Sequence, residues 1–482
     1  MAEVTIAQAV MALCCHQGIY KLYNDYYHGS HRPVLSSTKW RNAFGSRFRG
    51  FRDNLCPSVV DAVADRLQLT GFDLEDMAEE SGPRSEKRPP ESDAAMRIWR
   101  RNRMDRNAGH VHLEALRTGD AYVLAWPDIR NEARIFPQRA DEIAVYYSEE
   151  DPQVIEWAAK GWFERDEIDP SKKRFRLVLY YADRIEKYIT RETVEETPKD
   201  RAAYIENPGE GEAWPLANPY GIVPVFHFAN NACTGDGGVS ELKEIIPLQD
   251  GLNKAMCDLL VALEFVSLPQ RYIIGIEPEV DEETGEPKQP YKPGVDTLWM
   301  LSGGRTPDQP TSAGQFPQAD LTHHMNAISE FRAEIARVSG TPLHYMMLLG
   351  GAPPSGEALK TLEARLIKKV LDRQISFGNS WEDVMSFCLL IQGQADVKFN
   401  TTWTDPAPKS ELEHAQTVQV KETIGISTEQ ALIELDYTAE QIAEMMAAKQ
   451  AEAQQQFDQQ MALMQARPAG PPRTGGAPQN AG

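Results

Sequence analysis

Two stretches of helical periodicity, separated by a segment rich in proline and glycine, constrain this chain more than any other feature. Apolar residues recur every three or four positions over residues 240–268 and again over residues 319–340. This spacing predicts two long helices, each with one continuous buried stripe. The stripe residues are Ile245, Leu248, Leu252, Met256, Leu259 and Leu263 in the first helix, and Leu321, Met325, Ile328, Phe331, Ile335 and Val338 in the second.

Local signals mark the ends of these helices. Ser240 is placed to cap the first helix, with Glu241 and Glu244 in its first turn, where carboxylates complement the helix dipole. Gly340 and Pro342 mark the end of the second helix. Residues 269–318 between them predict a small β unit, with strands at Tyr272–Ile276 and Thr297–Leu301 around an acidic insert.

The residues before this pair of helices predict a helical part and then a β-rich part. Helices are expected between Thr5 and Leu69 and from Asp93 to Arg117, with a surface loop from Glu79 to Ser92. Residues 121–228 contain short β-branched and aromatic runs separated by turn residues. The predicted strands are Ala121–Trp126, Ile143–Tyr147, Arg174–Tyr181 and Val223–Phe228. The fold class is therefore α+β, mainly helical.

An apolar loop and a second helical region follow. Residues 346–354 are apolar, rich in glycine and bounded by proline, an unusual composition for a surface loop. A long helix is predicted from Gly356 to Leu390, with a kink expected at Gly378, and then a strand at Val397–Trp403. Helices are expected over residues 410–465, and the Pro-, Gly-, Ala- and Gln-rich residues 466–482 should be disordered.

Charge and composition limit the function. The formal net charge is −21, which argues against tight, general DNA binding through phosphate contacts. No apolar run reaches membrane-spanning length and the N-terminus lacks a signal sequence, so we expect a cytoplasmic protein that does not enter a membrane. The six cysteines form no CxxC pair and are expected to be free and mostly buried.

Catalytic motifs are absent from the sequence. In the nearest match to a phosphate-binding loop, Gly351 to Lys360, Glu357 stands where the lysine belongs. His110, His112 and Glu114 lack a second ligand pair and are expected to be polar residues on a helix surface, as are His323 and His324. No GxSxG motif is present, and Ser355 is better placed to cap the following helix. We therefore expect no enzyme, no cofactor and no metal site.

The order of these parts resembles that of siphophage portal proteins, in particular portals of phages that infect actinobacteria. In that architecture two stem helices flank a clip domain and are followed by a tunnel loop, a wing helix and a crown. The strings that carry the resemblance are Gly238–Lys254, Trp40–Gly45, Asn54–Pro57, Ser339–Tyr345 and Pro354–Leu359. The resemblance covers most of the chain, without its low-complexity tail.

The resemblance implies a domain order. The wing would comprise residues 1–239, with the stem helices at 240–268 and 319–340 on either side of a clip at 269–318. Residues 341–355 would form the tunnel loop region, and 356–405 the wing helix and its return strand. The crown would be 406–465, followed by the tail 466–482. In this arrangement Leu348, Leu349, Gly350, Gly351, Ala352, Pro353, Pro354 and Ser355 would lie near DNA.

The resemblance also implies a function in the virion. Twelve subunits would form a ring at one capsid vertex, through which double-stranded DNA is packaged and ejected. Expected partners are the terminase large subunit, a head-tail adaptor, and the major capsid and scaffolding proteins. The acidic clip residues Asp281, Glu282, Glu283 and Glu286 are either a partner surface or a solvated hairpin tip, and the sequence favours the tip.

Two alternatives remain open. One is another non-enzymatic head-tail adaptor or capsid structural protein, against which the chain length and the helix–clip–helix order argue. The other is a soluble nucleic-acid-processing enzyme, against which the absence of a catalytic constellation argues.

Overall fold

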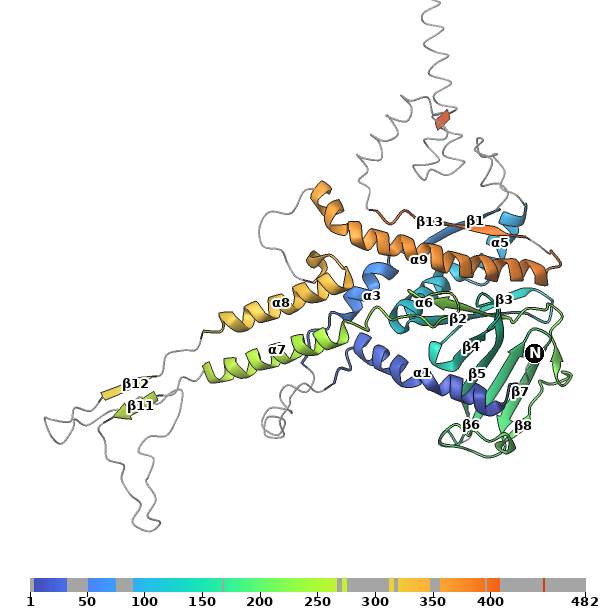
Figure 1. The fold of residues 1–482 in the computed structure, drawn as a ribbon, viewed down its shortest axis with the longest axis horizontal. Coiled ribbons are helices and arrows are strands. Elements are labelled where there is room, and N and C mark those ends of the chain that lie inside the picture. The colour runs from blue at the N-terminus through green and yellow to red at the C-terminus, as the bar shows by residue number, and fades with distance from the viewer. Residues whose placement is uncertain are drawn as a thin grey trace, which may run out of the picture. The chain divides into compact units, whose positions relative to one another are not determined.

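The computed structural model describes residues 4–32, 51–74, 90–166, 169–266, 271–274, 312–315, 320–346, 356–394, 397–407 and 445–446 (Figure 1). The chain divides into two units, Met1–Pro406 and Ala407–Gly482. In the second unit only Ala407, Met445 and Met446 are described. The predictions for residues 410–465, the two methionines apart, and for the tail 466–482 therefore lie outside the described residues.

The N-terminal part is helical, as predicted. Helix α1 (Ile6–Tyr27) begins at a capping box in which Thr5 and Gln8 bond to each other's backbone amides. Its apolar face packs on β5 through residues such as Val10 and Leu13. Helix α3 (Cys56–Ala64) has Pro57 in its first turn, where a missing N–H is harmless, and buries Val59, Val60 and Val63.

The helix predicted from Asp93 to Arg117 is in fact two helices, α5 (Pro90–Arg101) and α6 (Met104–Thr118). Arg103 between them adopts a left-handed conformation with φ of 55°, which no α-helix accommodates. The Asn102 amide stabilises the break by donating to the carbonyls of Ile98 and Ala133. Pro90–Ser92, assigned to a loop from the sequence, are the first residues of α5.

Two antiparallel sheets form the β-rich part. The smaller has the order β10-β2-β3 (Val225–Ala229, Asp120–Pro127, Ala133–Gln138). The larger follows the order β4-β5-β6-β7-β8, and β9 also pairs with β7. Its strands are β4 (Ile143–Tyr147), β5 (Ile155–Arg165), β6 (Lys173–Tyr181), β7 (Arg184–Thr190), β8 (Tyr204–Glu206) and β9 (Leu216–Ala217).

Short 3₁₀ helices at η1 (Ala140–Glu142) and η2 (Arg201–Ala203) lie between these strands. Another, η3 (Leu343–Tyr345), lies further along the chain, before α9 (Gly356–Ile391). The four strands predicted in residues 121–228 are all present, as β2, β4, β6 and β10. Because helices and two sheets share the described unit, α+β is confirmed and "mainly helical" is supported only in part.

Helix α9 (Gly356–Ile391) spans the main core and runs alongside β13 (Phe399–Trp403), which pairs with β1 (Leu69–Leu74) (Figure 1). The helix is continuous through Gly378. A Cβ at Gly378 would lie 2.5 Å from Thr401 Oγ1. The glycine is therefore explained by close packing of β13 against the helix rather than by the kink that the sequence suggested.

His112 corrects another prediction, since it is a core residue and not a surface one. The side chain is buried and stacks on Phe377. Trp381 Nε1 donates to His112 Nε2 over 2.8 Å, and His112 Nδ1 lies 3.2 Å from the carbonyl of Leu67. Burial lowers the pKa of His112 to about 4, so the ring is neutral at pH 7. A neutral imidazole that accepts from the indole must donate from Nδ1.

The two predicted helices that flank the β unit are α7 (Ile246–Val266) and α8 (Thr322–Ser339), which pack side by side (Figure 1). Both lead to a pair of antiparallel strands, β11 (Arg271–Ile274) and β12 (Ser312–Gln315). The first helix begins at Ile246 rather than at Ser240, because the ring of Pro247 would clash with the carbonyl of Lys243 inside a continuous helix. Ser240 instead accepts from the amide of Leu242 in the preceding turn.

The apolar stripes of α7 and α8 are buried only in part. Leu252 and Ile335 are fully buried, whereas Leu263 is 41% and Met325 is 61% exposed. The prediction of continuous buried stripes is therefore wrong for the single chain, because nothing described covers the ends of the helices near β11 and β12. Among the described helices none has both the length and the apolar character to cross a membrane.

The described cysteines are free, as predicted, but only half of them are buried. Cys56, Cys257 and Cys388 are buried, and Cys14, Cys15 and Cys233 are exposed. The exposed three lie on a helix face or in a loop that the rest of the unit does not cover.

Candidate functional site

The predicted tunnel-loop residues, Leu348 to Ser355, and the acidic clip residues, Asp281, Glu282, Glu283 and Glu286, lie outside the described residues. The structure does place both flanks of the loop. Helix α8, the short helix η3 and Met346 precede it, and α9 follows it. Three sets of polar contacts hold these flanks, and together they form the candidate site, which we call the junction.

The first set connects η3 to α9 and to the end of α3. Glu363 on α9 accepts hydrogen bonds from Tyr345 (3.2 Å) and Arg66 (3.1 Å), and the same Arg66 Nη2 donates to the Tyr345 hydroxyl (2.8 Å). His344 Nε2 lies 3.5 Å from the Glu363 carboxylate. Because Glu363 is buried, these bonds are shielded from water and fix the last residues before the loop against the start of α9.

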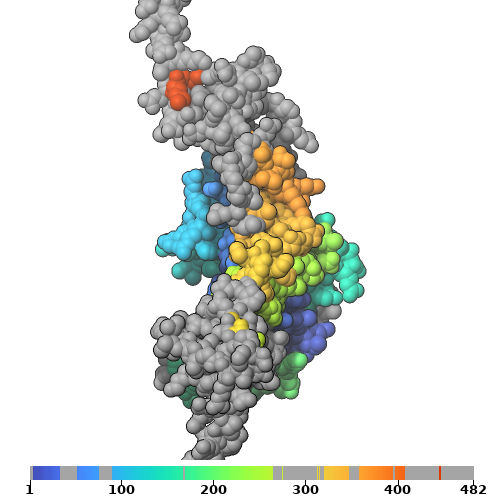
Figure 2. Space-filling view, turned by 90° about the vertical axis from the view of Figure 1, so that its left-hand side faces the viewer, coloured from blue at the N-terminus to red at the C-terminus, as the bar shows by residue number. Residues whose placement is uncertain are grey.

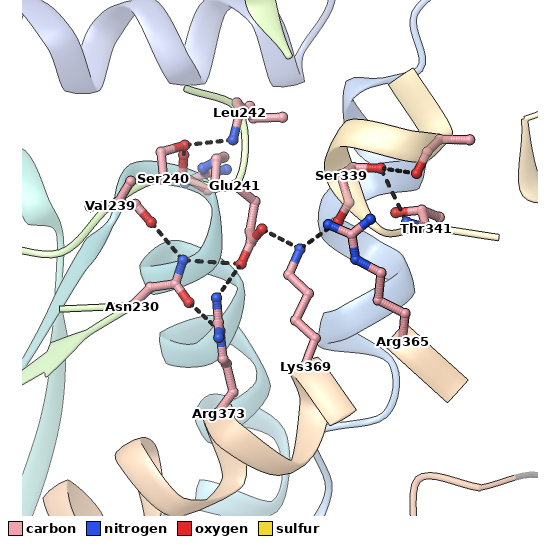
Figure 3. A network of polar contacts seen from close by, with 12 residues as sticks. Asn230, Val239, Ser240, Glu241, Leu242, Ser339, Thr341, Arg365, Lys369 and Arg373 are labelled. Atoms are coloured by element: carbon pink, nitrogen blue, oxygen red, sulfur yellow. Dashed lines mark hydrogen bonds and ion pairs between the residues drawn. The ribbon is translucent and has the colours of Figure 1, made fainter. Parts of the chain in front are cut away.

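The second set is centred on Glu241, which lies in the turn before α7 (Figure 3). Its Oε1 accepts from Arg373 Nη2 at 3.0 Å and from Asn230 Nδ2 at 3.2 Å, and its Oε2 pairs with Lys369. Arg373 also donates from Nε to Asn230 Oδ1 at 2.9 Å. The Glu241 side chain is only 8% exposed, so this buried carboxylate is compensated by two cations from α9.

The third set ties the C-terminus of α8 to α9. Lys369 Nζ donates to the carbonyl of Ser339 at 3.0 Å (Figure 3). Arg365 Nη1 donates to the carbonyl of Arg337 at 2.7 Å. These carbonyls belong to the last turn of α8, where a helix has unpaired acceptors and partial negative charge. Gly340 ends the helix in a left-handed conformation with φ of 73°. Lys369 on α9 thus connects the turn before α7 with the end of α8.

A cavity of about 370 Å³ opens on the junction, between the turn before α7 and α9. Five cations line it against three carboxylates, a local excess of positive charge in a chain of net charge −21. The cations are Lys243, Arg365, Lys368, Lys369 and Arg373, and the carboxylates are Glu241, Glu244 and Asp372.

Three buried polar atoms near the junction lack a hydrogen-bond partner within the described part of the chain. They are Arg66 Nη1, Thr341 Oγ1 and His344 Nδ1. Buried polar groups in folded proteins are almost always paired.

Helix α7 is held on its other side by amide and carboxylate side chains. Gln249 accepts from the amide of Leu55 (3.0 Å), and Asn253 accepts from the amide of Asp53 (3.1 Å). Asp53 in turn pairs with Arg332 of α8 at 2.7 Å. The segment before α3 therefore binds both helices and fixes them relative to the sheet-bearing part.

A second buried polar cluster lies away from the junction. Asp120 accepts hydrogen bonds from His227 Nε2 (2.8 Å), the Tyr20 hydroxyl (2.6 Å) and the amide of Gly238 (2.6 Å). The other ring nitrogen of His227, Nδ1, is hydrogen-bonded to the Tyr147 hydroxyl at 2.8 Å. Burial alone would raise the pKa of Asp120, but these hydrogen bonds outweigh it and lower the pKa. Both carboxylate oxygens and both ring nitrogens are paired within the protein, so the cluster is a structural clamp between α1 and β10.

The sequence motifs that suggested chemistry are not brought together. His112 is in the core while His110 is exposed, and within the described residues no group of three or more His, Cys, Asp or Glu side chains could hold a metal. Two parts of the chain more than 100 positions apart do converge, one with Asn230 and Glu241 and the other with Lys369 and Arg373. Of these four residues the sequence pattern singles out only Glu241.

Comparisons with known proteins agree on one family. The sequence matches the family described as "Phage portal protein, SPP1 Gp6-like" over residues 59–456. The portal protein of Mycobacterium phage L5 is 26% identical over 404 residues, which cover 80% of this chain and 76% of that protein. The portal protein of Mycobacterium phage D29 is 26% identical over 368 residues, 72% of this chain and 68% of that protein.

Among solved structures, a chain from the neck of an empty gene transfer agent particle is similar, with 14% identity and a TM-score of 0.45, covering 84% of this chain and 96% of that one. The family match spans most of the chain and includes α7, α8, α9 and the whole junction. The chain belongs to the SPP1 Gp6-like family of phage portal proteins.

Proposed function

We propose that this chain is one subunit of a twelve-membered ring that forms the head-tail connector at a capsid vertex, through which DNA is packaged and ejected. The observation that carries this proposal is the pair of helices α7 and α8, whose apolar stripes are exposed at the ends nearest β11 and β12. A subunit of a closed ring buries such surfaces against its neighbours on both sides.

The domain order follows from this proposal. The wing is 1–239, the stem helices lie within 240–268 and 319–340, and the clip is 269–318. The tunnel loop region is 341–355, the wing helix and return strand are 356–405, the crown is 406–465 and the tail 466–482. The junction then connects stem, wing and tunnel loop, because Glu241, Ser339 and Lys369 belong to the segments that meet there.

The tunnel loop would act on DNA by packing and bending rather than by binding phosphates. Residues Leu348 to Ser355 contain no charged side chain, so they offer no ion pair that would stall a moving duplex. The junction holds both flanks of the loop in buried ion pairs and hydrogen bonds. This arrangement fixes both ends of the segment that is proposed to contact DNA.

The remaining partners belong to the same proposal. The terminase large subunit would dock during packaging and a head-tail adaptor afterwards, with the major capsid and scaffolding proteins around the ring. Asp281, Glu282, Glu283 and Glu286 in the clip are a candidate surface for one of these proteins. The protein would reach the virion from the host cytoplasm, where it is made.

Native mass measurement and end-on imaging of the purified protein test the proposal. Twelve copies of a 54.0 kDa chain give a ring of about 650 kDa with a central hole. A compact monomer, or a small oligomer without a hole under all conditions that keep the protein folded, would contradict it.

A further inference from the structure

An arginine-rich surface on α5 and α6 stands out in this acidic chain. Arg97, Arg100, Arg103 and Arg106 are all exposed, and within the described residues none of their side chains has an ion pair. We call these four residues the arginine surface. Arg101 beside them forms an ion pair with Glu132, the residue directly before β3. The only exposed carboxylates on α5 and α6 are Asp93 and Asp105.

The arginine surface is held rigidly. Its centre is the break at Arg103, fixed by the Asn102 amide, and Asn102 Oδ1 accepts from the amide of Ile135 at 3.1 Å. Trp99, buried beneath the helix, donates to Asp105 at 3.1 Å. An exposed cationic surface on a rigid support loses little conformational freedom when it binds a partner.

An acidic surface lies on the turn between β4 and β5. Glu149, Glu150 and Asp151 are exposed, and within the described residues no cation pairs with them. We call these three residues the acidic hairpin. The turn is ordered by Ser148 Oγ, which accepts from the amides of Glu150 (3.3 Å) and Asp151 (3.4 Å). Val154 next to it is 52% exposed.

The two surfaces lie on opposite sides of the first unit. In Figure 2 the segment around α5 and α6, coloured cyan, is at the left, and the segment around residue 150, coloured teal, is at the right. They therefore cannot satisfy each other within one chain. A cyclic ring repeats one head-to-tail contact, which requires two different and complementary surfaces on opposite sides of each subunit.

We propose that the acidic hairpin of one subunit docks on the arginine surface of the next, and that this contact helps to set the register of the ring. The inference rests on the proposed function, because it assumes a ring. A DNA duplex would match the arginine surface alone and would leave the acidic hairpin unexplained. A second copy of the chain explains both, and its arginines can form bidentate bonds with the carboxylates.

Charge reversal tests the pairing. One variant carries Arg97→Glu and Arg100→Glu, a second carries Glu149→Arg and Glu150→Arg, and a third combines all four changes. The first two should each raise the concentration needed for ring formation by about tenfold or more, since like charges then face each other. The combined variant should return to within about threefold of the wild type. Ring formation is measured by native mass over a dilution series.

Matched controls have the same charge changes elsewhere. Arg165→Glu with Arg174→Glu reverses two exposed arginines on β5 and β6, and Glu195→Arg with Glu196→Arg reverses two exposed carboxylates. Both should form rings at the wild-type concentration. Circular dichroism spectra identical to the wild type exclude misfolding of the variants.

The outcomes separate this inference from the proposed function. Ring formation at the wild-type concentration in all charge variants would overturn the pairing and leave the proposed ring unaffected. Ring formation by the Arg97/Arg100 variant at the wild-type concentration, together with lost DNA binding, would assign the arginine surface to nucleic acid and would also overturn the pairing. An impaired combined variant, no better than either parent, would show that the two surfaces do not meet. Absence of rings in the wild type would instead contradict the proposed function.

Discussion

Glu241, in the turn before α7, pairs with Arg373 in the middle of α9, with 3.0 Å between Oε1 and Nη2. The two residues are brought together although 132 positions separate them. Since the side chains of both are almost completely buried, breaking the pair would be strongly destabilising. The pair fixes the turn before α7 against the middle of α9.

Replacing Glu241 should destabilise the protein strongly. In Glu241→Ala, Lys369 and Arg373 keep their buried charges without a carboxylate, and we expect the free energy of unfolding to fall by about 3 kcal/mol. Denaturant unfolding followed by tryptophan fluorescence measures this. Glu244→Ala is the matched control, because Glu244 lines the same cavity but is exposed, and it should change stability by less than about 0.5 kcal/mol. Equal effects of the two substitutions would contradict the role of Glu241.

The buried His112 should make the protein sensitive to acid. Its folded-state pKa of about 4 lies below the ordinary value of 6.5. Between these two pH values His112 is protonated in the unfolded chain but neutral in the folded chain. The contribution of neutral His112 to the free energy of unfolding is therefore fully present above pH 6.5. It falls as the pH drops from 6.5 toward 4, by up to about 3 kcal/mol.

The variant His112→Gln removes this titration and should flatten the difference in unfolding free energy between pH 6.5 and pH 4. His323→Gln, at an exposed position on α8, should keep the wild-type pH profile. An unchanged slope in His112→Gln would show that other groups cause the acid sensitivity.

Two glycines inside helices should respond to alanine in opposite ways. In Gly378→Ala the new Cβ would meet Thr401 Oγ1 at 2.5 Å and push β13 away from α9, at a cost of about 1–3 kcal/mol. At Gly18 in α1 nothing lies within 4 Å of the Cβ position, so Gly18→Ala should stabilise by about 0.5–1 kcal/mol through helix propensity. Thermal unfolding of both variants checks the pair. A gain in stability for Gly378→Ala would disprove the close-packing role.

The long helices were predictable because their signal is local. The periodicity of α8 and α9 and the left-handed Gly340 all follow from residues a few positions apart. Strand β5 was missed because Ala158, Ala159 and Gly161 interrupt its alternation. Gly161 is needed there, since a Cβ would lie 2.4 Å from the Phe175 ring, and that ring belongs to another strand.

The junction could not be predicted because its partners are distant in sequence. Glu241 was expected to act on a helix dipole in the first turn of its own helix, but Pro247 moves the helix start to Ile246 and leaves Glu241 free to reach α9. His112 looked like a surface residue because its burial depends on Phe377 and Trp381. Tertiary contacts of this kind have no local pattern.

Binding of random duplex DNA should be weak. The net charge of −21 opposes phosphate contacts over most of the surface, and we expect micromolar or weaker affinity at physiological salt. Fluorescence anisotropy with a labelled duplex measures the dissociation constant. Submicromolar binding to random sequence would contradict a channel through which DNA slides.

Deletion of Leu348–Ser355 tests the segment that we propose as the tunnel loop. Because the junction holds η3 and α9 through Glu363, Glu241 and Ser339 without any residue of the loop, the deletion carrying a short Gly-Ser linker should fold and assemble like the wild type. Its DNA packaging should fail, since the segment proposed to contact the duplex is gone. Native mass and packaged DNA per particle are the two measurements. A matched variant that replaces the eight residues by Gly and Ser of equal length tests whether apolar side chains, rather than loop length, are needed. Loss of soluble protein from the deletion would assign the segment to the core instead, and normal packaging would remove it from the DNA path.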